Sequence, residues 1–240
     1  MNSLINVFLT EDRVFPLAPP GFPAGQRRYI RGHLPNSDKL DIFKYMMLSM
    51  KPIRHIFDKF YILCELDTSY AHRQAELDDF LAEHFPDAVY LKKRLCYQKD
   101  WIEFLDTRLD EVEHWFVNCN HDHIFLDSSL AGIYNVIAEF EQDTSEFKCI
   151  YPTHWPEVIF EAIKYSAVPL GQHTSYHAGM IGDGTLFVNS SVIKHWFYSK
   201  QYPQDRKMPR PDFDGGGVDC AHGKVFAPLR ELFRHFDGYA

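Results

Sequence analysis

The stretch that decides the fold is HWFVNCNHDHIFLDSS, residues 114–129. The apolar run HWFVN has the length of a buried strand, and it ends abruptly in Asn-His-Asp-His before the chain becomes apolar again. Asn120 and Asp122 follow this run two residues apart, so their side chains would point to the same side if the chain stays extended. An amide oxygen and a carboxylate at one point suit a hard divalent cation such as Mg²⁺ or Mn²⁺.

The residues before this stretch alternate between strand-like and helix-like patterns. Strands are predicted at 3–10, 55–67, 87–93 and 114–118, with helices at 36–50, 72–85 and 97–113 between them. Strands that alternate with helices at this spacing predict a parallel sheet with right-handed crossovers and helices on its faces. The predicted fold is therefore α/β, with a mostly parallel central sheet flanked by helices in a single domain.

The second half of the chain is less regular. Helices are predicted at 129–142, 155–167 and 228–236, a strand at 146–152, and a strand, turn and helix across 184–200. The segments 171–185 and 201–217 are rich in glycine and other turn residues, and both are predicted to be loops. Long loops in compact domains are often functional, so these two segments are candidates for contacts with a ligand.

The composition bounds the class of protein. The chain has 240 residues, 45% of them hydrophobic, and a formal net charge of -8. This is an ordinary balance for a soluble globular domain, and the acidic charge argues against a general nucleic-acid binder. No apolar run is long enough to cross a bilayer, and the first residues lack the basic start of a signal peptide. Three of the five cysteines, Cys64, Cys119 and Cys149, lie in apolar segments, which favours reduced thiols and a cytoplasmic protein.

The order of the elements and the polar turn after the fourth strand resemble the GT-A nucleotide-sugar glycosyltransferases, over residues 4–125. In that family the strand ends in an Asp-x-Asp motif, whose last Asp holds a metal that bridges the two phosphates of the donor. Asp122 matches that last Asp, and Asn120 stands where the first would be. Asn is neutral and a weaker ligand, so either Asn120 contacts the ribose or the metal indirectly, or metal dependence is weak.

Further binding residues follow from the resemblance. In the family the base lies over the end of the first strand, which Thr10 follows here, and Asp67 ends the second strand at the same edge, where it would contact the base or the ribose. Arg94, Gln98 and Trp101 follow the third strand. An arginine at that place forms bidentate bonds to a diphosphate, and a tryptophan stacks on a flat ring.

The segment RPDFDGGGVDCAHGK, residues 210–224, has the densest set of chemically active side chains. Its three consecutive glycines allow close backbone approach to a ligand. In the resembled family a late His completes the metal site, and a late Asp or Glu acts as base on the acceptor hydroxyl. The resemblance therefore implies that His222 is a metal ligand and that Asp219 or Asp214 is the catalytic base.

The function that the resemblance implies is transfer of a sugar from a nucleotide-diphosphate donor to a glycan or lipid-linked saccharide acceptor, as in polysaccharide biosynthesis. Mn²⁺ or Mg²⁺ would be the cofactor. Residues 1–127 would bind the nucleotide sugar and residues 128–240 the acceptor, within one domain. An enzyme with a lipid-linked acceptor would be cytoplasmic and peripheral to a membrane.

Two other functions remain open from the sequence. Asn-His-Asp-His after an apolar strand resembles the second half of the His-x-His-x-Asp-His run of metallo-β-lactamase-like hydrolases, although Cys119 and His121 break that spacing and residue 118 is Asn. Zinc in such enzymes takes several nitrogen ligands, so three or more His ligands would favour a hydrolase. The second alternative is a non-catalytic module that binds a nucleotide or carbohydrate, in which the acidic turn is only structural.

Overall fold

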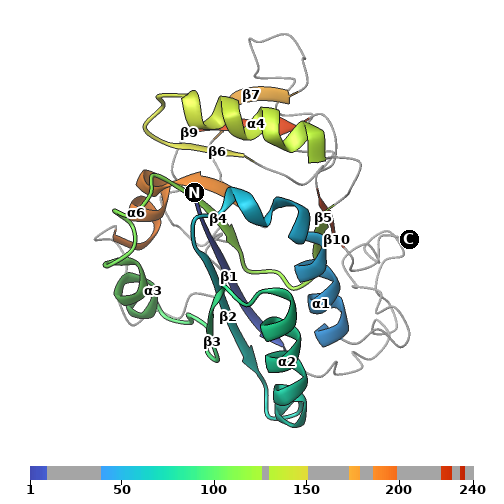
Figure 1. The fold of residues 1–240 in the computed structure, drawn as a ribbon. Helices are drawn as coiled ribbons and strands as arrows, with labels where there is room; N and C mark the ends of the chain where they lie inside the picture. The colour runs from blue at the N-terminus through green and yellow to red at the C-terminus, as the bar shows by residue number, and fades with distance from the viewer. Residues whose placement is uncertain are drawn as a thin grey trace, which may run out of the picture.

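The described part of the chain has an α/β fold (Figure 1). The computed structural model describes residues 1–9, 39–125, 130–150, 173–178, 186–198, 223–228 and 233–235. Up to residue 125 the elements are β1 (Asn2–Leu9), α1 (Lys39–Ser49), the 3₁₀ helix η2 (Lys51–Ile56), β2 (Phe60–Leu66), the short turn η3 (Ala71–Arg73), α2 (Gln74–His84), β3 (Val89–Leu91), α3 (Gln98–Leu105), β4 (His114–Asn118) and β5 (His123–Phe125). After it come α4 (Leu130–Gln142), β6 (Lys148–Ile150), β7 (His173–Ala178), β8 (Leu186–Asn189), α6 (Ser190–Tyr198), β9 (Gly223–Pro228) and β10 (Phe233–His235).

The central sheet contains eight of these strands, in the order β3-β2-β1-β4-β8-β6-β9-β7. The first four are parallel to one another, β8 is antiparallel to both of its neighbours, β9 is parallel to β6, and β7 is antiparallel to β9. Most of the strands therefore share one direction, as the sequence predicts. Strands from before and after residue 127 belong to this one sheet, and β5 pairs with β10 in a separate two-stranded sheet.

The order of connection reverses around β1. The chain passes from β1 to β2 and β3 on one side, and then returns to β4 on the other side of β1. Side chains of α1 and α2 pack in one hydrophobic cluster, whereas those of α3 pack in another. The crossovers before and after β3 thus cover opposite faces of the sheet. The neighbouring strands β1 and β4 point toward the same carboxyl edge, which is where open α/β sheets bind their ligands.

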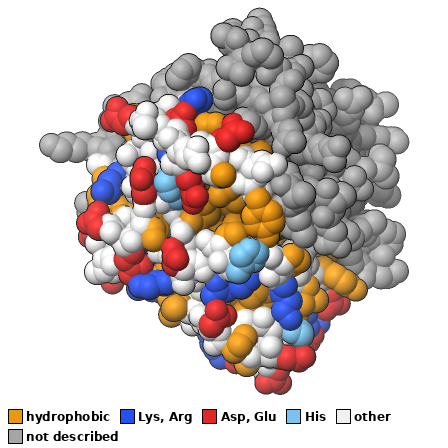
Figure 2. Space-filling view, turned by 45° about the horizontal axis from the view of Figure 1, so that its top comes forward, with side chains coloured by type: hydrophobic (Ala, Val, Ile, Leu, Met, Phe, Trp, Pro, Cys, Tyr) orange, Lys and Arg blue, Asp and Glu red, His pale blue; other side chains and the backbone are white. Residues whose placement is uncertain are grey.

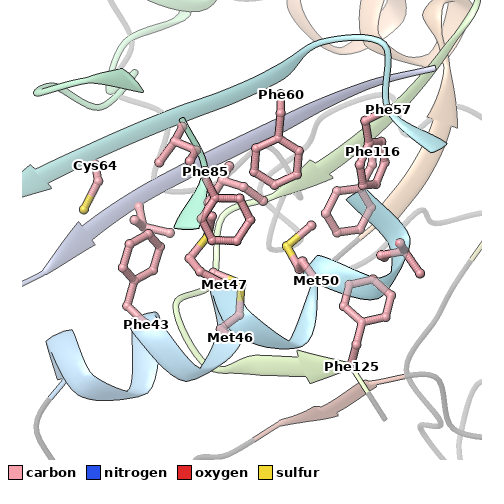
Figure 3. Packing of buried hydrophobic residues seen from close by; sticks show 14 of the residues in the cluster. Phe43, Met46, Met47, Met50, Phe57, Phe60, Cys64, Phe85, Phe116 and Phe125 are labelled. Atoms are coloured by element: carbon pink, nitrogen blue, oxygen red, sulfur yellow. The ribbon is translucent and has the colours of Figure 1, made fainter. Parts of the chain in front are cut away.

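Alternation along the strands fills the two faces. On β1, Ile5, Val7 and Leu9 point into the larger cluster, and Leu4 points into the other. The larger cluster receives the methionine and phenylalanine face of α1, which lies along the sheet with Met46, Met47 and Met50 toward the strands (Figure 3). The second cluster receives α3 and α6 and is built around large aromatic side chains.

Three local predictions are corrected by the structure. The helix expected at 97–113 ends at Leu105, and the chain continues as hydrogen-bonded turns in which Leu109 is still buried, so the apolar spacing runs beyond the helix. Residues 233–235 form β10 rather than part of a helix, because their hydrogen-bond partners lie in the distant β5. The segment expected to be a loop at 171–185 contains β7, which pairs with β9.

The surface carries charges of both signs, and the described cysteines form no disulfides. On the face shown in Figure 2, acidic and basic side chains lie interspersed rather than gathered by sign. Cys64 and Cys149 are buried free thiols, and burial raises the pKa of both. Within the same residues, no helix has both the length and the apolar character that crossing a membrane requires.

A polar cluster joins the end of α4 to the sheet. Lys148 of β6 is almost fully buried, and its ammonium donates to the carbonyl oxygens of Phe140 (2.8 Å) and Asp143 (2.6 Å) at the end of α4. The carboxylate of Asp143 pairs with Lys224 of β9 and accepts the backbone N–H of Ser145 at 2.9 Å. A cation at a helix C-terminus also complements the helix dipole, so the cluster fixes α4 on the sheet.

The Asp143 carboxylate is expected to make stability depend on pH. Burial opposes its ionisation, but hydrogen bonds from Lys224 and Ser145 outweigh this and lower the pKa of Asp143 from 3.8 to about 2. A depressed pKa stabilises the fold above pH 3.8, and this contribution is lost as the pH falls toward 2. Asp143→Asn should lower the free energy of unfolding at pH 7 by roughly 2 kcal/mol in urea titrations.

The difference between Asp143→Asn and wild type should shrink as the pH is lowered toward 2. Asp79→Asn changes an exposed carboxylate of α2 and serves as the matched control, with no such trend. A constant difference between Asp143→Asn and wild type at all pH values would show that the charge of Asp143 is not what stabilises this contact.

Candidate functional site

A polar turn follows β4 at the carboxyl edge of the sheet. The side chain of Asn118, the last residue of β4, is fully buried, and its Oδ1 accepts the backbone N–H of Asn120 at 2.9 Å. This is an Asx turn, and the chain bends at His121 instead of staying extended. The prediction that Asn120 and Asp122 alternate along an extended chain is therefore wrong, and their environments differ: Asn120 is half-buried, whereas Asp122 is buried.

Asp122 lies at the edge that the sequence predicts. It sits between the end of β4, which pairs with β1, and the start of β5. The residue is only 2% exposed, so its carboxylate lies inside the protein rather than in solvent. A buried carboxylate is costly unless it is paired or coordinates a cation, which makes this a chemically significant group rather than a solvated turn residue.

The donor chemistry of this turn fits a hard divalent cation. Asn120 and Asp122 offer an amide oxygen and a carboxylate, and Mg²⁺ or Mn²⁺ is commonly held by one or two such groups together with phosphate oxygens and water. In the part of the chain that the structure describes, no group of three or more His, Cys, Asp or Glu side chains is gathered to hold a metal. The nitrogen-rich zinc site of the hydrolase alternative is thus not found among these residues.

Arg94 reaches the same edge from the loop after β3. Its guanidinium lies over the ring of Phe8 on β1, 3.9 Å from the ring centroid, and its Nε is 3.7 Å from Oε2 of Glu65 on β2. Phe8 and Glu65 are neighbours in the parallel register near the carboxyl ends of their strands. With its side chain 27% exposed, Arg94 presents a stacked, oriented guanidinium at the predicted edge. Such a planar fork binds phosphate in two parallel hydrogen bonds.

A buried asparagine of β1 connects the two loops. The Nδ2 of Asn6 donates to the carbonyl oxygen of Leu95 at 3.2 Å, and its Oδ1 accepts the N–H of Leu95 at 2.8 Å. The same Nδ2 is 4.0 Å from the sulfur of Cys119, the residue between Asn118 and Asn120. Asn6 therefore holds the loop of Arg94 against β1 and touches the turn after β4.

Two residues expected to bind the donor lie in the core instead. Trp101 is 1% exposed, and its ring stacks on Phe197 of α6 with centroids 4.7 Å apart and planes at 8°. Gln98 is also buried, and its amide donates to the carbonyl oxygen of Phe197. Both side chains fasten α3 to α6, so the prediction that they contact the nucleotide sugar is withdrawn. The helix that follows the third strand is amphipathic, so it exposes some of its residues and buries others. The sequence alone did not tell which residues of this helix are buried.

Asp67 lies at the predicted edge but is used by its own turn. Its backbone N–H extends the β1–β2 ladder by donating to Leu9 at 2.8 Å. Its carboxylate accepts the N–H of Thr68 at 2.7 Å and hydroxyl hydrogen bonds from Thr68 and Ser69 at 3.2 and 3.3 Å. A base or ribose would have to compete with these bonds for the carboxylate.

Four predicted site residues lie outside the described residues: Thr10, Asp214, Asp219 and His222. The sequence reading also missed Asn6 and Asn118, which organise the edge through backbone contacts. The signal for both was present, because an asparagine inside an apolar strand is costly to bury unless its amide has partners.

The comparisons with known proteins bring no relative. No family model matches the chain, and no curated protein matches it in sequence.

Loss of the Asn6 amide should destabilise the protein strongly. Asn6→Leu leaves both the N–H and the carbonyl of Leu95 buried without their partner, which should lower the free energy of unfolding by roughly 2–4 kcal/mol in urea titrations. Lys93→Ala removes an exposed side chain of the same loop and should change it by less than about 0.5 kcal/mol. Equal stability of the two variants would refute the anchoring role of Asn6.

Proposed function

We propose that this protein is a glycosyltransferase of the GT-A type, which transfers a sugar from a nucleoside-diphosphate donor to a glycan or a lipid-linked saccharide. The observation that carries the proposal is the position of the Asn120–Asp122 turn. It follows β4 directly, at the carboxyl edge, where the connection order reverses around β1. A buried carboxylate at such a switch point supports a site for a phosphorylated ligand and its cation.

The second support is the position of Arg94 near the carboxyl ends of β1 and β2. Arg94 is oriented by Phe8 and Glu65, and Asn6 holds its loop while touching Cys119 in the turn after β4. The leaving group of a sugar transfer is a nucleoside diphosphate, whose charge must be stabilised as the bond to the sugar breaks. Arg94 takes the role of binding that diphosphate.

Asp122 takes the role of cation ligand, and Asn120, two residues before it in the same turn, takes the role of a second oxygen donor. A divalent cation supplies charge neutralisation for the departing diphosphate. From the sequence we retain Asp219 or Asp214 as the base that accepts the proton of the acceptor hydroxyl, and His222 as a further ligand. The donor sugar side would involve residues 1–127, and the acceptor side residues 128–240.

The carboxylate of Asp122 provides the first test. Uridine, guanosine or cytidine diphosphate with Mn²⁺ should raise the melting temperature of the wild-type protein. When the ligand is at 100 times its Kd, the free energy of unfolding should rise by about 2.7 kcal/mol. Asp122→Asn keeps the shape of the side chain and removes its charge, and it should abolish the Mn²⁺-dependent part of the shift, measured against the variant's own melting temperature.

Asp110→Asn alters a carboxylate that is 91% exposed in the turns after α3, and it is the control for the loss of one charge. It should keep the full Mn²⁺-dependent shift. The proposal fails if no diphosphate with Mn²⁺ stabilises the wild-type protein, or if Asp122→Asn retains the shift.

The geometry of Arg94 provides the second test. Arg94→Lys keeps the charge but loses the planar fork and the stacking on Phe8, so diphosphate affinity in calorimetric titrations should fall about tenfold. The neighbouring Lys93→Ala removes an exposed cation from the same loop and should change the affinity much less. If the two variants bind the diphosphate with equal affinity, the planar geometry of Arg94 does not contribute to binding and only its positive charge does.

A further inference from the structure

The segment between β4 and Phe125 is attached to the last turn of α1 at both of its ends. At the first end, Nδ2 of Asn118 donates to the sulfur of Met46 at 3.7 Å. At the second end, the backbone N–H of Phe125 donates to the hydroxyl of Ser49 at 3.0 Å. Ser49 in turn donates to the carbonyl oxygen of Met46 at 2.6 Å. One residue of α1, Met46, therefore takes part in both attachments.

The attachments are reinforced from within the core. Phe125 belongs to the same hydrophobic cluster as Met46, and its ring lies 5.9 Å from that of Phe116 on β4 (Figure 3). Asn118 uses its other amide atom, Oδ1, to hold the N–H of Asn120. The segment that carries Asp122 is thus fixed by contacts with β4, by contacts with α1 and by the turn between Asn118 and Asn120.

These polar contacts are not needed to fill the core. Asn118 and Met46 are both fully buried, and an apolar side chain at 118 would avoid the cost of burying an amide. The amide of Asn118 instead makes contacts that lead to α1 and to the turn of Asn120. The arrangement resembles the outer contacts that orient the ligands of metal sites, which fix direction rather than contribute a bond to the metal.

We propose that Met46, Ser49 and Asn118 form a positioning clamp, which sets the direction of the Asp122 carboxylate for a divalent cation. The inference rests on the proposed function. The three clamp residues act through Asn120 and Asp122 and do not contact the ligand. The last turn of α1 then supports the segment that carries Asp122. Cation binding and the conformational order of that helical turn are therefore coupled.

The experiment measures Mn²⁺ alone, by the electron paramagnetic resonance signal of the free ion during titration of the full chain. Ser49→Ala removes the hydroxyl, and Asn118→Leu removes the amide. Each variant should weaken Mn²⁺ binding about tenfold or more, the range seen when outer contacts of metal ligands are lost. Ser49→Thr restores a hydroxyl and should restore affinity to near the wild-type value.

Ile62→Val on β2 is the control for general loss of stability. It shortens a fully buried side chain of the same sheet and should cost about 0.5–1.5 kcal/mol without changing Mn²⁺ affinity. Amide hydrogen exchange gives a readout independent of the metal. Amide exchange at residues 118–125 should be faster in Ser49→Ala and Asn118→Leu than in the wild-type protein. Mn²⁺ should slow amide exchange in the last turn of α1 only when all the clamp residues are intact.

The possible failures are distinguishable. If the wild-type protein binds no Mn²⁺, both the proposed function and the role of the clamp are overturned. If the wild-type protein binds Mn²⁺ and both variants bind it equally well, only the clamp is overturned. If Ile62→Val weakens binding as much as Ser49→Ala does, or Ser49→Thr fails to restore it, the effect is one of global stability and the clamp is again rejected.

Discussion

The carboxyl edge of this sheet depends on the hydrogen bonds of one buried side chain, Asn6. Its amide satisfies both backbone groups of Leu95 and touches Cys119, so a single residue of the central strand β1 sets the course of the loops on either side. Those loops carry Arg94 and Asp122, the two charged groups on which the proposed site rests. The backbone amide and carbonyl of the buried Leu95, in the loop after β3, need partners, and Asn provides both a donor and an acceptor in one planar group.

The same solution recurs elsewhere in the molecule. Asn189, at the end of β8, donates to the carbonyl oxygen of Glu146 at 2.8 Å and accepts the N–H of Lys148 at 3.4 Å. Asn2, at the start of β1, accepts the N–H of Lys59 at 3.1 Å. Buried amides at strand ends thus continue the ladder where neighbouring chains diverge. Each one buries an amide in the core and fixes the path of the neighbouring chain at that strand end.

The sequence predicts the elements whose patterns are local, and fails where partners are distant. The alternation of strands and helices up to β4, and the position of Asp122 at the edge, follow from hydrophobic spacing and from the direction of parallel strands. The pairing of β5 with β10 does not, because 233–235 has no strand signal of its own and takes its conformation from residues more than a hundred positions away. Trp101 was assigned to the ligand for a related reason. Aromatic side chains serve cores and binding sites equally well, and only the stacking on Phe197 separates the two uses.

The two edges of the sheet differ in how their charges are arranged, and this favours the carboxyl edge as the functional one. At the amino edge Glu111 accepts hydrogen bonds from Asn2 (3.1 Å), Lys59 (2.6 Å) and Tyr61 (3.3 Å), and although burial opposes it, the bond from Lys59 lowers the pKa of Glu111. Charge there is compensated within the fold. At the carboxyl edge, among the described residues, Oε2 of Glu65 lies 3.7 Å from Nε of Arg94 and orients the guanidinium, whose planar fork suits an anion. A charged group that the fold orients without fully compensating is the arrangement a binding site requires, because its remaining interaction energy becomes available only when the ligand arrives.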